Sequence, residues 1–276
     1  MDYRTHALEK LAALPSIWSV LRYPTTRLFQ KKNGPTDVTQ TVTYENGQTK
    51  KVRNDYITSL LSNEKFAPRL GGKSEAVHLS RTISNTPVYV DRGTEADRIS
   101  GRTSKTTSTE YNPFTGRIKI SPYTSYVGSD KYFYDPENSF QRKRKLLHEN
   151  FHAMYENSPF YSSTVKDSLA KFNIPYTLRY NPDINDKEGY INQPSEQAAV
   201  FNELRSQLGL MPGTGTGPNG TFTQEDLNGA LQTKKYDKEM YNLFFGDKPE
   251  GYLLHLFNNA KNKKTPSFRH WTTMVS

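Results

Sequence analysis

Two histidines four residues apart, with a glutamate directly after the first, are the residues of this chain whose spacing best fits one chemistry. They are His148, Glu149 and His152, within the stretch HENFH. On an α-helix, residues four apart lie on one face, so both imidazoles can face one Zn²⁺. Glu149 can then act as general base toward a water on that metal. The spacing predicts a zinc site that activates water for attack on a carbonyl.

Coincidence is the alternative, because a chain of this length with six histidines contains such a pattern by chance roughly one time in a hundred. The local sequence favours a helix from Pro136 to Tyr155, with a proline and acidic residues at its front and Pro159 beyond its end. The apolar residues of this segment recur at spacings of seven, four and three: Phe140, Leu147, Phe151 and Met154. We therefore expect a half-buried helix with both histidines at the edge of its buried stripe.

The motif and its uncharged surroundings resemble the zincin metallopeptidases. Without any cysteine, a metal site in this chain must use His and carboxylate ligands. Tyr155 and Ser158 stand where the metzincin branch would have Gly and His, which excludes that branch. The resemblance covers roughly residues 110 to 210, and it implies Zn²⁺ as cofactor and hydrolysis of peptide (amide) bonds.

The third ligand is expected downstream on a second helix, predicted from Pro194 to Leu204 with Ser195 as its N-cap. This segment resembles the glutamate-ligand zincins (gluzincins), which implies that Glu196 is the ligand. Ala199, a small residue, would let the second helix approach the first closely.

Other assignments at this site stay open. An orienting Asp of the thermolysin-like enzymes is replaced by Val200, and Glu203 could take its role, although a surface glutamate is the more common interpretation. His255 fits a packed position in an apolar helix better than a ligand. Four carboxylates compete with Glu196 as the third ligand: Glu156, Asp183, Asp186 and Glu188.

Substrate contacts are predicted on both sides of the motif. The alternating segment from Gly116 to Ser121 is typical of a short strand, and the resemblance implies that it forms the edge of the cleft and pairs with a peptide. Zinc peptidases also stabilise the oxyanion with a Tyr, His or Arg. Tyr190 is our candidate for that contact because it is the nearest tyrosine before the second helix.

Composition and charge narrow the function classes. A net charge of +9 suggests an acidic partner, but the basic residues are dispersed and no nucleic-acid module accompanies them. The basic run from Arg142 to Lys145 is interpreted as a solvated helix face. No apolar run is long enough to span a membrane, and residues 1–23 do not resemble a secretory signal. We therefore expect a protein of the cytoplasm or one packaged in a virion.

The remaining segments predict an α+β fold with a small mixed sheet, an active-site helix and a helical C-terminal subdomain. Three parts are expected: an N-terminal helix and hairpin region (1–75), a zincin-like catalytic core (76–210) and a glycine-rich linker with C-terminal helices (211–276). A hairpin should turn at Asn46-Gly47. Other predicted elements are helices at 5–13, 54–62, from 223, 239–245 and 251–257, strand-like runs at 76–83, 86–91 and 117–121, and an exposed loop at 93–109.

The function predicted from the sequence is that of a zinc-dependent metallopeptidase acting on a protein or peptide. The alternative is a structural or interaction protein of a larger assembly, such as a phage virion. Such a protein would contact other virion or assembly proteins and keep a zincin-like fold with little or no proteolysis.

Overall fold

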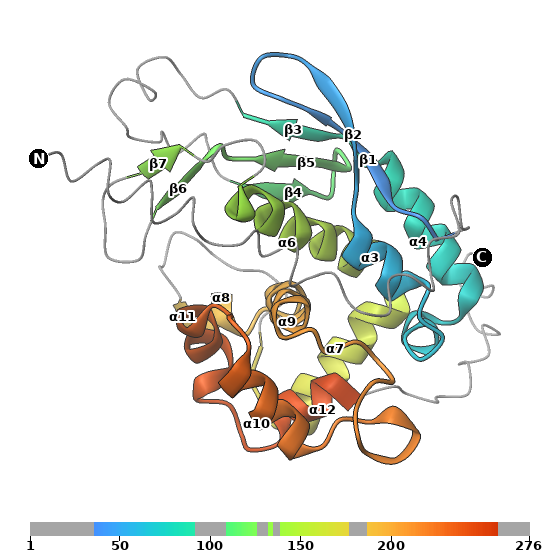
Figure 1. Cartoon of the computed structure of the whole chain (residues 1–276), viewed down its shortest axis with the longest axis vertical. Coiled ribbons are helices and arrows are strands. Elements are labelled where there is room, and N and C mark those ends of the chain that lie inside the picture. The colour runs from blue at the N-terminus through green and yellow to red at the C-terminus, as the bar shows by residue number, and fades with distance from the viewer. Residues whose placement is uncertain (1–35, 92–108, 126–131, 135–138, 177–186, 259–276) are drawn as a thin grey trace, which may run out of the picture.

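A computed structural model describes residues 36–91, 109–125, 132–134, 139–176 and 187–258. The predicted helix at 5–13 and most of the predicted loop at 93–109 lie outside these residues. The described part of the chain is mixed α+β, with a small open sheet above a group of helices (Figure 1). This confirms the predicted α+β class.

The main sheet has five strands in the order β2-β1-β3-β5-β4. The pairs β1–β2 and β4–β5 are antiparallel, while β3 runs parallel to both of its neighbours, so the sheet is mixed. A separate two-stranded sheet, β6–β7, follows β5 in the chain. The strands are β1 (Thr39–Thr43), β2 (Thr49–Arg53), β3 (Val88–Val90), β4 (Glu110–Asn112), β5 (Arg117–Ile120), β6 (Tyr123–Ser125) and β7 (Tyr132–Tyr134).

The predicted hairpin is confirmed as β1–β2. The Tyr44 N–H donates to the Gln48 carbonyl at 2.8 Å, which closes the turn. Gly47 lies at φ 81°, a backbone angle that glycine adopts without steric cost. The predicted strands at 86–91 and 117–121 are likewise confirmed as β3 and β5.

The interpretation of residues 76–83 as a strand is wrong. These residues belong to helix α4 (Lys73–Asn85). Ala76, Leu79 and Ile83 are all buried, and their spacings of three and four residues place them on one helical face. The β-branched residues of this segment favoured a strand, but burial of that face determines the structure.

The prediction that the 116–121 strand is an edge strand able to pair with a peptide is also wrong. β5 pairs with β3 on one side and with β4 on the other. The edge is β4, which joins β5 through a turn in which Asn112 Oδ1 accepts from the Phe114 and Thr115 N–H groups. At the tip of this turn the Phe114 side chain is 98% exposed.

Nine α-helices occur among the described residues. The predicted helices at 54–62, from 223, at 239–245 and at 251–257 are confirmed as α3, α10, α11 with the π-helical turn after it, and α12. The helices are α3 (Asp55–Leu61), α4, α6 (Phe140–Asn157), α7 (Pro159–Lys171), α8 (Lys187–Ile191), α9 (Pro194–Leu208), α10 (Gln224–Thr233), α11 (Lys238–Tyr241) and α12 (Tyr252–Asn258), with the π-helical turn at Asn242–Gly246.

Helix α6 lies between the sheet and helix α9 (Figure 1). Its Leu146 packs with the apolar side chains of β1, β3 and β5. Phe151 and Met154, which are fully buried, pack into the larger core formed by the helices. α6 therefore connects the two halves of the core, and its position is determined from both sides.

The C-terminal helices belong to the larger core. Phe222, Leu227 and Phe244 are buried in the same cluster as Ile57 and Leu79 from the N-terminal part. The predicted boundaries at 75 and 210 stay a prediction, although this shared core crosses both of them.

The segment 212–220 differs from the linker that its glycines suggested, because it folds back on itself. The Gly215 N–H donates to the Gly220 carbonyl, and the Gly217 N–H donates to the Thr221 carbonyl. Asp226 Oδ2 accepts from the Thr216 N–H at 2.9 Å. α10 begins with a capping box, in which the Thr223 side chain accepts from the Asp226 N–H and the Asp226 side chain accepts from the Thr223 N–H.

Two buried arginines bind the end of α12. The guanidinium groups of Arg69 and Arg205 both donate to the carbonyls of Leu256 and Phe257, over 2.6 to 3.4 Å. The Arg205 guanidinium also lies 4.6 Å from the centroid of the Phe201 ring. These contacts join α12 to α9 and to the turn before α4.

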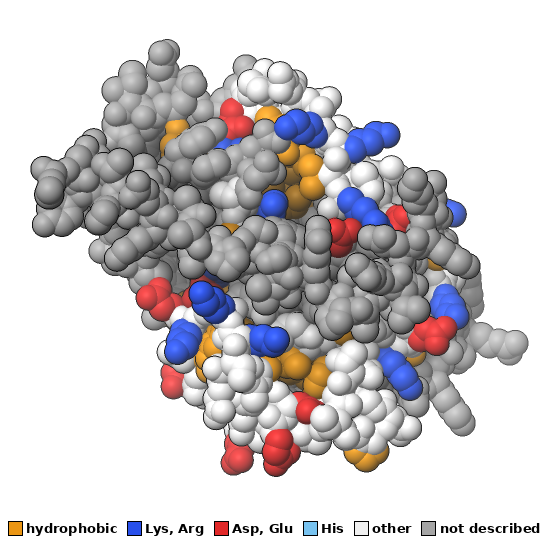
Figure 2. All heavy atoms as spheres, viewed as in Figure 1, with side chains coloured by type: hydrophobic (Ala, Val, Ile, Leu, Met, Phe, Trp, Pro, Cys, Tyr) orange, Lys and Arg blue, Asp and Glu red, His pale blue; other side chains and the backbone are white. Residues whose placement is uncertain are grey.

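On the face shown in Figure 2, the described residues form no patch of one charge sign. Lys, Arg, Asp and Glu side chains of the described residues are scattered across it (Figure 2). Among the described helices, none is both long and apolar enough to cross a membrane.

Candidate metal centre

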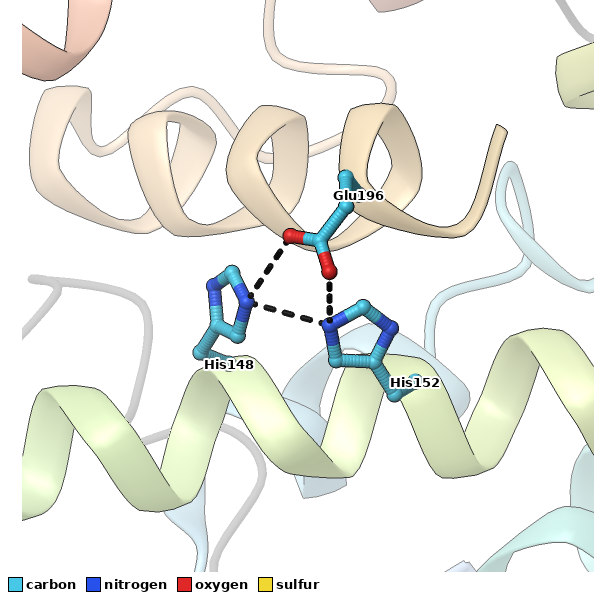
Figure 3. Close-up of side chains that lie close together, drawn as sticks. All are labelled: His148, His152 and Glu196. Carbon is cyan, nitrogen blue, oxygen red and sulfur yellow. Dashed lines mark hydrogen bonds and ion pairs between the residues drawn. The ribbon is translucent and has the colours of Figure 1, made fainter. Parts of the chain in front are cut away.

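Helix α6 carries the HENFH motif in its middle. The helix begins at Phe140, where the Ser139 side chain caps it by accepting from the Arg142 N–H at 3.1 Å. The predicted start at Pro136 lies outside the described residues. The helix continues to Asn157. His148 and His152 are therefore one turn apart, well inside a continuous helix, and their side chains lie on the same face (Figure 3).

Helix α9 carries Glu196 in its first turn. Gln193 is the N-cap residue and Pro194 opens the helix, so the predicted N-cap at Ser195 is wrong. Proline suits this position because the first turn leaves its N–H groups without helical partners. Ala199 is fully buried in this helix. α9 lies directly opposite α6, and Glu196 points toward the two histidines (Figure 3).

The three side chains converge on one point. The two Nε2 atoms of His148 and His152 lie 3.1 Å apart. Glu196 Oε2 is 3.5 Å from Nε2 of His148, and Glu196 Oε1 is 3.3 Å from Nε2 of His152. Among the described residues, these three form the single group of His and carboxylate side chains able to hold a metal ion.

These separations fit zinc. Ligand bonds of about 2.0 to 2.2 Å in tetrahedral geometry place neighbouring ligand atoms about 3.3 to 3.6 Å apart. The 3.1 Å between the two Nε2 atoms and the 3.5 and 3.3 Å from each of them to a Glu196 oxygen lie near that range, with each histidine facing a different oxygen of the carboxylate. Two imidazole nitrogens facing each other at 3.1 Å are also an arrangement that a shared cation stabilises.

Glu196 and His152 each stabilise the charged form of the other. Burial raises the pKa of Glu196, but hydrogen bonds from His148 and His152 outweigh burial and hold that pKa well below its usual range. Burial lowers the pKa of His152, while the hydrogen bond and the charge of Glu196 raise it, so that the net direction is upward. Glu196 is thus an ionised carboxylate, the form that binds a metal.

Glu149 lies against this cluster on the same helix. Its side chain is buried, and burial raises its pKa, although the charges of His148 and His152 act in the opposite direction. The Tyr111 backbone of strand β4 lies close to this carboxylate and also lowers its pKa. The predicted base is therefore close to the two histidines and also to the edge of the sheet.

Tyr190 reaches the same place from helix α8. Its hydroxyl donates to Glu196 Oε2 at 3.0 Å, and its ring packs edge-on against Phe244. The structure therefore brings this residue to the cluster, while its role toward an oxyanion stays a prediction.

The rival ligands are not part of the cluster where the structure describes them. Glu156 and Glu188 are both exposed and belong to no group that could hold a metal. His255 packs against the Phe172 ring and contacts Lys171. Asp183 and Asp186 lie outside the described residues.

The interpretation of residues 142–145 as a solvated face is wrong. Arg142 is buried and pairs with Glu45. Arg144 pairs with Glu203 and Asp237. Lys145 donates to the carbonyls of Ser121 and Tyr123. A run of four cations suggests solvent exposure, but three of these side chains, those of Arg142, Arg144 and Lys145, reach partners distant in sequence, which sequence patterns do not indicate.

Glu203 is not a surface residue either. Its side chain is only 3% exposed, and its Oε2 lies 3.2 Å from Nδ1 of His148. Glu203 therefore occupies the place suggested for it, beside the ring nitrogen of His148 that faces away from the cluster.

Comparison with known proteins does not assign the chain to a class. No protein-family model, no curated protein and no solved structure matches it. Any assignment of function to this chain therefore depends on the geometry of the site.

Proposed function

We propose that this protein is a zinc-dependent metallopeptidase of the zincin kind. The observation that carries the proposal is the convergence of His148, His152 and Glu196 with a buried glutamate directly beside them. His148, His152 and Glu196 would hold the ion. Two helices supply these ligands, as in the glutamate-ligand zincins that the sequence resembles.

The exposure of the ligands favours a catalytic site over a structural one. The side chains of His148, His152 and Glu196 are 20%, 14% and 13% exposed. Structural zinc sites use four protein ligands and exclude water, whereas catalytic sites leave one position open. Three ligands that solvent still reaches fit the second kind.

The chemistry divides between the ion and the side chains. A bound Zn²⁺ lowers the pKa of a water toward neutrality and polarises a carbonyl. Glu149 would take a proton from the attacking water and give it to the leaving amine. Burial of Glu149 favours this exchange, because the raised pKa makes its carboxyl a better proton acceptor and still an effective donor. Tyr190 would donate its hydroxyl hydrogen to the developing oxyanion once it leaves Glu196.

The substrate would lie along β4. This strand is an edge of the sheet, and its Tyr111 backbone lies close to the Glu149 carboxylate. The Asn157 side chain donates to the Tyr111 hydroxyl at 3.2 Å, which holds β4 against the end of α6. An extended peptide that adds to β4 would therefore pass the proposed base.

The first experiment compares wild type with Glu149→Gln in cleavage of a peptide library and in bound zinc. We expect the variant to bind zinc as wild type does and to lose at least about a hundredfold in kcat/KM, as for loss of a general base. Glu156→Gln is the matched control, because Glu156 lies on the same helix but is exposed. It should keep both properties.

Two results would contradict the proposal. Equal cleavage by wild type and Glu149→Gln would remove Glu149 from the mechanism. Zinc bound at one equivalent without any turnover would favour the alternative, a structural or interaction protein of a larger assembly.

A further inference from the structure

A closed ring of polar contacts lies behind His148, on the side away from the cluster. Glu203, on α9, contacts Nδ1 of His148 with its Oε2. Its other oxygen, Oε1, accepts from Nε of Arg144 on α6 and from Nε2 of Gln207 at 3.4 Å. Both oxygens of this buried carboxylate are therefore used, and each has a different partner.

The ring closes through the residue that precedes α11. Nη1 of Arg144 lies 2.6 Å from Oδ2 of Asp237. The Asp237 N–H donates to Oε1 of Gln207 at 2.7 Å, which returns the chain of contacts to Glu203. Asp237 Oδ1 also caps α11 by accepting from the Met240 N–H at 2.9 Å. The start of α11 is thus connected to the His148 ring through Arg144.

These contacts restrict the orientation of the His148 ring. Because Arg144 and Gln207 occupy Oε1, the Glu203 carboxylate presents Oε2 to Nδ1 of His148. When a metal ion is bound at Nε2, a carboxylate at Nδ1 accepts the remaining ring proton and fixes the orientation of the ring. Arg144 makes no direct contact with the cluster, so its effect on the metal must pass through Glu203.

We propose that Arg144 is a positioning residue, held by Asp237, through which the packing of α11 determines how tightly His148 binds zinc. This inference rests on the proposed metal site, but it does not require peptidase activity. Asp237 links the two elements, because its carboxylate pairs with the Arg144 guanidinium and also caps the backbone of α11. Their hydrogen bonds and the Arg144 charge outweigh burial and lower the pKa of Asp237, so the carboxylate stays ionised.

The test uses Arg144→Met, which keeps the apolar stem of the side chain and removes its donors. Zinc affinity is measured by competition with a chromophoric chelator. We expect binding about 10- to 100-fold weaker than wild type, the usual effect of losing a contact behind a metal ligand. Asp237→Asn should weaken zinc binding in the same direction and by less, because asparagine still caps a helix.

Arg142→Met is the matched control. Arg142 lies two residues earlier on α6 and is also buried in an ion pair, but its partner is Glu45 in the β1–β2 connection. It should lose stability without losing zinc affinity. Equal zinc affinities for Arg144→Met and Arg142→Met would overturn the proposal.

A second measurement separates this inference from the proposed function. NMR of the His148 ring in the zinc-free protein reports whether the ring is held in one environment. We expect one set of ring signals in wild type and Arg142→Met, and shifted or broadened signals in Arg144→Met. If wild type bound no zinc, the metallopeptidase proposal would fail, whereas an unchanged ring spectrum in Arg144→Met would refute the positioning role.

Discussion

The two oxygens of Glu196 have three neighbours: Nε2 of His148, Nε2 of His152 and the Tyr190 hydroxyl. No exposed carboxylate of α6 or α8 has comparable surroundings. Hydrogen bonds from both histidines keep Glu196 ionised despite its burial. The Glu196 side chain is therefore already ionised before a cation binds.

Glu196→Ala should reduce bound zinc to well below one equivalent, measured by atomic emission after dialysis against a low concentration of free zinc. The cause is direct, since two histidines alone leave the ion with too few protein ligands. Glu156→Ala is the control, and it should retain one equivalent. Full zinc occupancy in Glu196→Ala would exclude Glu196 as a ligand.

At the residue scale, the sequence predicted the residues whose spacing follows from helix geometry. His148, Glu149 and His152 are recognisable because residues four apart share a helical face. Glu196 was predicted from the resemblance to the glutamate-ligand zincins, and its carboxylate lies beside the two histidines. Arg144 and Asp237 could not be predicted from the pattern, since their contact joins residues far apart in the chain.

At the scale of elements, the segment 212–220 shows that glycines can be required by close packing. A Cβ at Gly215 would lie 2.1 Å from the Thr221 carbonyl oxygen, which is closer than any real contact. The backbone there cannot accept a side chain without moving. By contrast, a Cβ at Gly229 in α10 would meet nothing within 4 Å beyond its chain neighbours and the backbone of its own helix.

These two glycines give a matched prediction. Gly215→Ala should lower the free energy of unfolding by about 1–3 kcal/mol, the range for overpacking. Gly229→Ala should raise it by about 0.5–1 kcal/mol, because alanine favours a helix more than glycine does. Urea unfolding measures both. A neutral effect of Gly215→Ala would show that the segment yields easily, as a true linker would.

The elements that sequence patterns predicted correctly have local causes. The β1–β2 hairpin has Asn46-Gly47 at its turn, and α10 has a capping box. The errors concern tertiary context. Residues 76–83 fold as a helix because their apolar face is buried, and β5 is internal because β4 pairs with it.

Across the whole molecule, several tyrosines lie in the shared core. Tyr161 is buried, and its hydroxyl accepts a hydrogen bond from the Asn202 side chain on α9. Burial raises the pKa of Tyr161 to about 12, although the Arg205 charge acts in the opposite direction. Burial also raises the pKa values of Tyr155 and Tyr252.

These shifts predict alkaline destabilisation. Each phenol has a higher pKa in the folded state than in the unfolded state, where it is about 10. Their stabilising contribution is therefore complete below about pH 10 and is lost as the pH rises through the folded value. Tyr161 alone should account for about 1.4 kcal/mol of the decrease in unfolding free energy between about pH 8 and about pH 11.

Urea unfolding of wild type and Tyr161→Phe at both pH values measures this contribution. The variant should be less stable than wild type at the lower pH and should lose less stability on going to the higher pH. An identical decrease in both proteins would mean that Tyr161 ionises equally in the folded and unfolded states.

The arginine contacts at the end of α12 have a consequence for shortened forms of the protein. Removal of residues after Gly251 would delete no residue of the proposed metal site. It would, however, take the Leu256 and Phe257 carbonyls from two buried guanidinium groups, one of them on the helix that carries Glu196. A buried cation deprived of its acceptors is costly. Any truncated version must therefore extend at least through Phe257 to keep the two ligand helices together.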